Sequence, residues 1–380
     1  MKIALVHDWL TGMRGGEKCL EALCQIYPQT EIFTLLHNRG SVARKIEDKK
    51  IHTSFIQNLP LTNSKYQHYL PLFPLAIEQF DFSDFDLVIS SSHCVAKGAI
   101  TKPQTCHICY CYTPMRYAWE MYPTYFTHGS LNWFGRKLGK LFMTYLRSWD
   151  EASASRPDYY VAISKNVQNR IRKHYRRESE VIYPPVEVDS FPLSEKPGEY
   201  FLVVSALVPY KRVDLAVQAF NKLGSRLIII GEGSEKNSLT KMALKNIEFL
   251  PWQKQVRLKE YYSNCRALVF PGEEDFGIVP VEAQACGKPV IAFGRGGALE
   301  TVAGKFSEEI KSTDTKLTGI FFREQTTTSL AEAIKKSQEI EFEPHFARQN
   351  SLKFDIKIFK EKIQSFVAEK FAEHNELYRV

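Results

Sequence analysis

Short apolar runs recur along the whole chain at intervals long enough to hold a helix, and this alternation limits the possible folds more than any other feature. In the first half the candidate strands are 2–7, 31–36, 86–91, 106–112 and 159–164. The second half repeats the scheme at 200–205, 226–231, 247–251, 267–271 and 289–293. Such alternation is typical of parallel sheets with helices on both faces. The sequence therefore predicts two α/β domains, each with a doubly wound parallel sheet.

A proline-rich stretch, 182–199, separates the two halves and ends in a polar turn, as expected of a hinge between domains. The first domain is predicted to span 1–185 and the second 186–355. The C-terminal segment 356–380 has apolar residues at helical spacing, and we expect this helix to pack back on the first domain.

Composition limits the class of protein. Of 380 residues, 44% are hydrophobic and 13% aromatic, which is enough for large cores. There is no run of 18 apolar residues, and the chain opens with a strand-like segment, so the expected location is cytoplasmic. The eight cysteines lie mostly in apolar contexts and are expected to be reduced. In "CHICYC", Cys109 and Cys111 would point to one face of a strand and Cys106 to the other, which argues against a metal site within this motif.

Basic residues gather in two segments, 135–147 and 169–177, in a chain whose net charge is +7. Such clusters suit an anionic partner: a nucleotide phosphate, a lipid phosphate or an anionic membrane surface. A solvated helix face explains them equally well. No recognised nucleic-acid-binding module accompanies the charge, so nucleic acid is not expected as a partner.

Two carboxylates bracket an apolar segment in "PGEEDFGIVPVEAQACGKPVIAFGRGG". Glu274 follows a candidate strand, and Glu282 lies about two turns further on, inside a predicted helix that ends near Gly287. Ligands of open parallel sheets bind at the carboxyl ends of strands, where helix N-termini favour anions. The two glutamates are therefore predicted to contact different parts of an elongated ligand.

Other strand ends carry glycines or cations. The first strand runs into "GMRGGEK", in which Gly15 and Gly16 allow backbone amides to approach a phosphate. In "VPYKRVDLA", Lys211 and Arg212 precede a helix N-terminus, where a bound anion would offset their charge. "GEG" at 231–233 is compatible with a nucleotide packed against backbone. A structural turn or a free surface pair remains an alternative for each of them.

Two further groups could bind a ligand. Asp84 and Asp86 have a spacing that could hold a divalent cation, although Asp is also an ordinary turn residue. The serines 90–92 and His93 follow at the carboxyl end of the next strand, a position that predicts contact with a ligand. A hydrogen-bonded structural histidine is the alternative.

Taken together, "EEDFGIVPVEAQACGKPVIAFGRGGALETV", "VPYKRVDLA", "GEG", "YPPVEVDSF", "TPMRYAWE" and "GGEK" resemble the retaining family 4 glycosyltransferases. The order of these motifs matches along nearly the whole chain, and the similarity is greatest to the bacterial mannosyltransferase-like branch that builds surface polysaccharides and O-antigens. The resemblance implies the GT-B fold, in which two Rossmann-like domains face each other across a cleft.

The resemblance also implies roles for residues of the second domain. Glu282 would accept hydrogen bonds from the ribose hydroxyls and Glu274 from hydroxyls of the transferred hexose. Lys211, assisted by Arg212, would balance the leaving diphosphate. Further donor contacts are implied at Gly231, Glu232, Phe276, Gly277 and Ile278.

In the first domain, Gly15 and Gly16 would close over the phosphates, and Arg116 of "TPMRYAW" would contact the substrate. Many relatives have His immediately before "TP", where this chain has Tyr112. We expect Tyr112 to position the donor sugar or the acceptor, with His93 as the polar contact to a sugar hydroxyl. A second departure is Ala206, which stands where many relatives carry an arginine.

The resemblance thus implies transfer of mannose or glucose from a nucleoside-diphosphate sugar to a hydroxyl of a glycan or lipid-linked glycan, with retention of configuration. The expected donor is GDP-mannose, with UDP-glucose second, and no metal or other cofactor is expected. The enzyme would work at the inner face of the membrane or free in the cytoplasm. The competing hypotheses are a sugar-nucleotide epimerase of the same architecture and a non-catalytic partner subunit.

Overall fold

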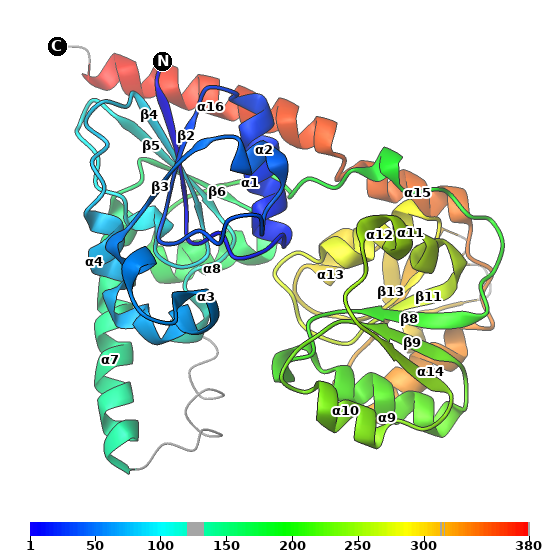
Figure 1. The fold of residues 1–380 in the computed structure, drawn as a ribbon. Helices are drawn as coiled ribbons and strands as arrows, with labels where there is room; N and C mark the ends of the chain where they lie inside the picture. The colour runs from blue at the N-terminus through cyan, green and yellow to red at the C-terminus, as the bar shows by residue number, and fades with distance from the viewer. Residues whose placement is uncertain (120–132, 312–313, 315, 379–380) are drawn as a thin grey trace. The chain divides into compact units, whose positions relative to one another are not determined.

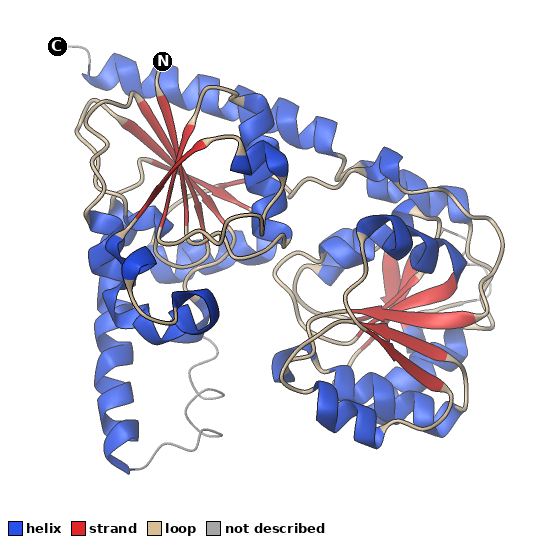
Figure 2. Cartoon of the chain, viewed as in Figure 1, coloured by secondary structure: helices blue, strands red, loops and turns tan. Residues whose placement is uncertain are grey.

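Two structural units make up the chain in the computed structural model, which describes residues 1–119, 133–311, 314 and 316–378. The first unit comprises 1–185 together with 359–380, and the second comprises 186–358. Each unit has a parallel sheet with helices on its faces (Figures 1 and 2).

The first unit is built on a seven-stranded parallel sheet in the order β3-β2-β1-β4-β5-β6-β7. Its strands are β1 (Ile3–His7), β2 (Glu31–Thr34), β3 (Lys50–Thr53), β4 (Leu87–Ser92), β5 (Cys106–Cys111), β6 (Tyr159–Ala162) and β7 (Glu180–Val181). The strand order reverses between β1 and β4, which are hydrogen-bonded neighbours. In doubly wound sheets, the two connecting loops at such a reversal lead apart and leave room for a ligand.

Helices cover both faces of this sheet. They are α1 (Gly15–Ile26), α2 (Arg44–Glu47), α3 (Thr62–Lys65), α4 (Phe73–Glu78), α5 (Arg116–Trp119), α7 (Trp133–Ala152), α8 (Lys165–Tyr175) and α16 (Ile356–Tyr378), with short 3₁₀ segments η1 (Phe55–Asn58), η2 (Tyr66–Leu72), η3 (Ala96–Gly98) and η4 (Ser153–Ser155). The C-terminal helix α16 lies against the first unit through Phe359, whose ring meets Tyr110 edge-on at 5.7 Å. Lys360 bonds Gln25 of α1 at 2.7 Å.

The second unit repeats the plan with the strand order β10-β9-β8-β11-β12-β14-β13. Its strands are β8 (Tyr200–Val204), β9 (Leu227–Ile230), β10 (Ile247–Leu250), β11 (Cys265–Phe270), β12 (Val290–Phe293), β13 (Gly304–Phe306) and β14 (Gly319–Phe322). Here the order reverses between β8 and β11, which pair in parallel.

The helices of the second unit are α9 (Val213–Leu223), α10 (Lys236–Met242), α11 (Gln255–Asn264), α12 (Ile278–Ala285), α13 (Ala298–Thr301), α14 (Thr327–Ser337) and α15 (Pro344–Leu352), with η5 (Val188–Ser190), η6 (Pro209–Lys211) and η7 (Ser307–Glu309). Alternate strand residues such as Val203 and Val269 pack with α9 and α14 in one apolar core. Their neighbours along the strands, such as Leu202 and Leu268, are also buried, so helices cover the sheet on both faces.

All ten predicted strands are present, with ends that differ by one or two residues. Four strands were not predicted: β3, β7, β13 and β14. Of these, β3 is partly exposed and β7 has only two residues, so neither gives the apolar run that marks a buried strand. β14 is buried throughout, so its short apolar run was a usable signal that the sequence analysis missed.

Candidate functional site

The strand reversal of the second unit brings together two loops that carry predicted site residues. The loop after β8 leads through η6 to Lys211, and the loop after β11 carries Glu274. The two side chains form an ion pair, each with just under a fifth of its surface exposed. A β-carbon on Gly272 would lie 2.9 Å from the Lys211 carbonyl oxygen, so a side chain at this position would push the two loops apart.

Arg212 follows Lys211 in the sequence, but its guanidinium pairs with a different carboxylate, that of Asp214. Its guanidinium contacts the Asp214 carboxylate through Nε at 3.1 Å and through a second nitrogen at 3.2 Å. The sequence analysis suggested that a bound anion offsets the two cations before this helix, with a free surface pair as the alternative. The structure shows that Glu274 and Asp214 already offset the charges of Lys211 and Arg212, so the cations alone do not demonstrate an anion site.

The loop that carries Glu274 continues through Phe276 and Gly277 into α12. Gly277 has φ of 96°, a left-handed conformation that favours glycine. The glycine loop after β12 packs directly on this segment: the Gly297 amide donates to the Glu274 carbonyl at 2.8 Å. A β-carbon on Gly297 would lie 2.3 Å from Phe276 Cα. The backbone amides from Ile278 onward form the N-terminus of α12, where free donors favour an anion.

Glu282 lies inside α12 and is only 4% exposed. Its carboxylate accepts a hydrogen bond of 2.8 Å from the hydroxyl of Tyr262, a fully buried residue of α11. Burial and the adjacent carboxylate raise the pKa of Tyr262 well above its ordinary value, so this hydroxyl stays a donor. Sequence reasoning missed Tyr262, because nothing in "EYYSNC" distinguishes it from a core aromatic.

Gly231 and Glu232 follow β9, next to the same loops. A β-carbon on Gly231 would lie 1.8 Å from the Ser205 carbonyl oxygen, so the two backbones can approach this closely only with glycine there. Glu232 is half exposed and pairs with Lys236 at 2.8 Å. The predicted glycine, carboxylate and cation positions of the second unit therefore gather at the carboxyl ends of β8, β9 and β11.

The first unit repeats this geometry at its own strand reversal. Asp8 follows β1, is fully buried, and accepts hydrogen bonds from four successive backbone amides. These are the amides of His93, Cys94, Val95 and Ala96, at 2.7 to 3.0 Å. Sequence reasoning missed Asp8, although a carboxylate directly after a buried strand was a usable signal.

His93 also bonds Asp8 through its side chain, with Nδ1 2.9 Å from the carboxylate. A third of the His93 side chain remains exposed, and its ring meets Trp9 edge-on at 4.5 Å. Burial alone would lower the pKa of His93, but the Asp8 carboxylate outweighs it and the pKa is raised. Burial alone would raise the pKa of Asp8, whereas His93 and His7 hold it well below its usual range. The pair thus favours an imidazolium that donates to Asp8.

Tyr112 lies in a buried chain of polar contacts. Its hydroxyl donates to the Gly16 carbonyl at 2.9 Å and lies 2.7 Å from Ser91 Oγ, which in turn is 3.0 Å from His7 Nδ1. The tyrosine is 9% exposed. The Tyr112 hydroxyl is therefore hydrogen-bonded to other residues of the first unit. Through these contacts Tyr112 links the start of α1 to the carboxyl ends of β1 and β4.

Three predicted residues lie in the first turns of helices. Gly15 is the first residue of α1, and the Gly16 α-carbon lies so near the His7 ring that a β-carbon there would be 3.4 Å from it. Arg116 begins the short helix α5. The final glutamate of "TPMRYAWE" lies outside the described residues.

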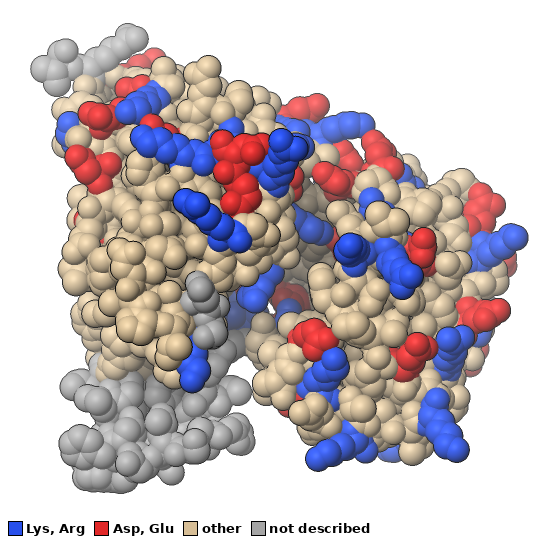
Figure 3. All heavy atoms as spheres, in the orientation of Figure 1, with Lys and Arg blue, Asp and Glu red and all other residues tan. Residues whose placement is uncertain are grey.

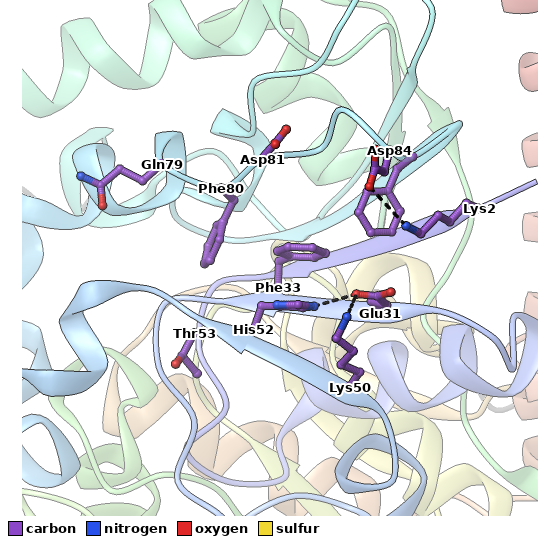
Figure 4. A pocket seen from close by; sticks show the side chains of 11 residues that line it. Lys2, Glu31, Phe33, Lys50, His52, Thr53, Gln79, Phe80, Asp81 and Asp84 are labelled. Atoms are coloured by element: carbon purple, nitrogen blue, oxygen red, sulfur yellow. Dashed lines mark hydrogen bonds and ion pairs between the residues drawn. The ribbon is translucent and has the colours of Figure 1, made fainter.

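Asp84 and Asp86 lie away from these loops. Asp84 pairs with Lys2 at 3.8 Å, and Asp86 accepts from the Lys2 amide at 2.6 Å. Asp84 lines a pocket of about 380 Å³ (Figure 4). In this pocket His52 stacks on Phe33 at 4.4 Å and bonds Glu31 at 2.7 Å. The two aspartates thus belong to local ion pairs at the amino ends of the strands, opposite the edge that carries Asp8.

We expect Tyr112→Phe to retain activity within about tenfold of wild type, because the ring stays packed and one neutral hydrogen bond is worth about 1 kcal/mol. Tyr112→Ala should lose most activity, since the start of α1 loses its contact. His93→Ala should be impaired, whereas the exposed His68→Ala should not. Initial rates with intact folding, checked by circular dichroism, test this. Abolition by Tyr112→Phe would show that the hydroxyl is essential, and an unaffected His93→Ala would remove His93 from the site.

Comparison with known proteins gives a family match within the second unit. Residues 187–353 match the family model of glycosyl transferases group 1. An uncharacterized glycosyltransferase of Methanocaldococcus jannaschii is 32% identical over 150 residues, which cover 38% of this chain and 42% of that protein. The O-antigen chain mannosyltransferase RfbU of Salmonella typhimurium is 31% identical over 159 residues, which cover 39% of this chain and 45% of that protein. The matched stretch thus spans less than half of each relative.

Solved structures match over nearly the whole chain. Anabaena HepE in complex with UDP has a TM-score of 0.70 at 16% identity, covering 97% of this chain and all of that one. The catalytic domain of starch synthase IV from Arabidopsis thaliana, bound to ADP and acarbose, has a TM-score of 0.65 at 11% identity, covering 98% and 99%. At this identity the likeness shows the fold alone, and it confirms the predicted GT-B class.

Proposed function

We propose that the chain moves a hexose from a nucleoside-diphosphate sugar to a hydroxyl of a glycan or lipid-linked glycan, because its residues 187–353 match the family model of glycosyl transferases group 1. The observation that carries this proposal is the grouping of Lys211, Glu274 and Glu282 around the strand reversal of the second unit. Names of relatives support a hexosyl donor: RfbU is called an O-antigen chain mannosyltransferase, and HepE is described in complex with UDP-glucose.

The ion pair between Lys211 and Glu274 suits such a donor. The hexose of a nucleotide sugar is bonded directly to the diphosphate, so a carboxylate for sugar hydroxyls and a cation for the diphosphate must lie side by side. As the anomeric bond breaks, negative charge grows on the diphosphate, where Lys211 and the N-terminus of α12 stabilise it. The incoming hydroxyl attacks from the face that the diphosphate leaves and passes its proton to a phosphate oxygen, which retains configuration.

Glu282 is assigned to the ribose hydroxyls. Its burial beside Tyr262 leaves a carboxylate in a low-dielectric position, where a charge-assisted hydrogen bond from a ligand is strong. In the first unit, His93, held by Asp8, is assigned to a sugar hydroxyl of the donor or the acceptor.

A panel of donors tests the proposed reaction. The full chain is incubated with GDP-mannose, UDP-glucose and ADP-glucose, and with candidate glycan acceptors, and the products are identified by mass spectrometry and by the anomeric coupling in NMR. We expect GDP-mannose to be used first and UDP-glucose second, with α-linked product from an α-linked donor. An isomerised nucleotide sugar without transfer would indicate the epimerase, and binding without any turnover would indicate the non-catalytic subunit.

The two glutamates are expected to differ in effect. Glu282→Ala should weaken the binding of the bare nucleoside diphosphate by about 10- to 150-fold, the value of one charge-assisted hydrogen bond. Glu274→Ala should leave that binding nearly unchanged and lower the rate of transfer. Calorimetry and initial rates measure the two effects, with the exposed Glu260→Ala of α11 as the control. The reverse pattern would exchange the two assignments.

We also expect transfer to proceed without added Mg²⁺ or Mn²⁺, because Lys211 and the amides of α12 supply positive charge at the diphosphate. Rates in buffer stripped of divalent cations should match those with millimolar Mg²⁺. A rate that depends on Mg²⁺ or Mn²⁺ would instead point to a metal-bound diphosphate.

Contact with an anionic membrane is proposed for the basic segments. On α8 the buried residues Val167 and Ile171 face inward, which leaves Arg172 and Lys173 exposed.

Among the described residues, no helix combines the length and the apolar character that a membrane-spanning segment needs. The side chains of 135–141 lie outside the described residues. On the face drawn in Figure 3, cationic and anionic side chains are interspersed. Sedimentation with anionic vesicles at increasing salt measures this contact.

A further inference from the structure

Three side chains with metal-binding atoms meet at the amino ends of the strands of the first sheet. Asp8 and His93 lie at the opposite, carboxyl ends of the strands. Cys106 is the first residue of β5, Asp158 immediately precedes β6, and His374 lies in the last turns of α16. One donor atom from each lies within 4.8 Å of the other two. The three residues are far apart in the sequence, so the fold alone brings them together.

His374 occupies a position where an apolar residue is expected. The buried face of α16 runs from Phe359 through Ile363 and Val367, and His374 continues it seven residues further on, with 2% exposure. Its Nδ1 lies 3.7 Å from the Asp158 carboxylate, beyond hydrogen-bonding distance. Its Nε2 has no hydrogen-bond partner among the residues that the structure describes. A buried imidazole so poorly satisfied is costly unless it binds something else.

The other two side chains are already positioned. Cys106 is fully buried at the start of its strand. The Asp158 carboxylate accepts a hydrogen bond of 2.7 Å from the His107 amide, and its backbone carbonyl accepts one from Arg177 at 2.7 Å. The first of these hydrogen bonds orients the carboxylate and the second holds its backbone. Side chains that bind metals are commonly oriented by such additional hydrogen bonds.

We propose that Cys106, Asp158 and His374 bind a zinc ion that fastens the C-terminal helix α16 to the amino ends of β5 and β6. Thiolate, imidazole and carboxylate together are a donor set typical of Zn²⁺. Zinc bonds of about 2.0 to 2.3 Å at tetrahedral angles place donors about 3.3 to 3.8 Å apart, so small side-chain rotations close the site around the ion. A water completes the tetrahedron on the solvent side of Asp158, which is 31% exposed. On binding, the thiol proton of Cys106 passes to solvent.

The sequence argument against a metal in "CHICYC" is compatible with this proposal. Cys109 and Cys111 take no part, and the two remaining ligands come from segments that the motif does not contain. The site is separate from the proposed donor site, so its failure would leave the transferase proposal untouched.

Cobalt and zinc binding test the proposal on the full chain without affinity-tag histidines, after removal of metals with a chelator. One equivalent of Co²⁺ should give a thiolate-to-cobalt absorption band in the near ultraviolet, and one equivalent of Zn²⁺ should abolish it. Cys106→Ala and His374→Gln should lose the band and bind zinc at least about tenfold more weakly. Cys109→Ala, a buried thiol on the same strand, should behave as wild type. Without metal, His374→Gln should have the same midpoint of thermal unfolding as the wild type. If Cys106→Ala folds poorly, His374→Gln therefore still tests the site.

Zinc should also raise the midpoint of thermal unfolding of the wild type by about 5 to 10 °C at a hundredfold excess over its Kd, with no shift for His374→Gln. The rate of sugar transfer below the transition should not change. Absence of a stoichiometric cobalt band in the wild type, or an equal band in Cys106→Ala, would overturn the proposal.

Discussion

Lys211→Ala is expected to lower kcat for sugar transfer by about 100- to 1,000-fold, the typical loss when one preorganised charge-stabilising group is removed from a transition state. The binding of the nucleotide sugar should weaken far less, by about tenfold or under, because the charge on the diphosphate grows only as the anomeric bond breaks. Steady-state rates and calorimetric Kd values on the same preparations measure the two quantities.

The control is Lys222→Ala, which removes an exposed cation from the last turn of α9 in the same unit. Because the Lys211 and Glu274 side chains are in contact, the effects of Lys211→Ala and Glu274→Ala on kcat should not be additive. Lys211→Ala combined with Glu274→Ala should lower kcat by less than the product of the single effects. Weaker donor binding with kcat unchanged for Lys211→Ala would show that the lysine stabilises the bound donor and the transition state alike.

Asp8→Ala is expected to cost about 3 to 5 kcal/mol of unfolding free energy, the range for breaking a buried, hydrogen-bonded ion pair. The carboxylate is fully buried and is the shared acceptor for four amides and His93, so its loss leaves several donors unsatisfied at once. Chemical denaturation measures the effect, and the exposed Asp48→Ala should be close to wild type. A loss below about 1 kcal/mol would show that water replaces the carboxylate.

The Asp8 and His93 pair should also shape the dependence of stability on pH. The pKa of Asp8 is lowered from 3.8 on folding, so its contribution is present above 3.8 and is lost as pH falls through the lower, folded value. The pKa of His93 is raised from 6.5, so its contribution is complete below 6.5 and is lost as pH rises through the folded value. The stability difference between wild type and Asp8→Asn should therefore be largest between pH 3.8 and 6.5.

The sequence predicted the fold class and most strands because buried parallel strands give continuous apolar runs. It also placed Lys211 and Glu274 in loops that follow strands, and Glu282 inside the helix after the second of these loops. That the three residues share a ligand site stays a prediction. It could not predict Tyr262 or the four amides on Asp8, because these contacts depend on which strands become neighbours in the sheet. Strand order leaves no local signal in the sequence, and for the same reason the meeting of Cys106 with His374 was not foreseen.

The assignment of Glu282 to the ribose is the central claim, and a comparison of nucleotides tests it most directly. Calorimetry should be run with the preferred nucleoside diphosphate and with its 2′,3′-dideoxy analogue, on wild type and on Glu282→Ala. We predict that removing the ribose hydroxyls weakens binding to wild type by about 10- to 150-fold and has almost no effect on Glu282→Ala, because the carboxylate that accepts from them is gone. Equal losses for the two proteins would contradict the assignment and place the ribose away from Glu282.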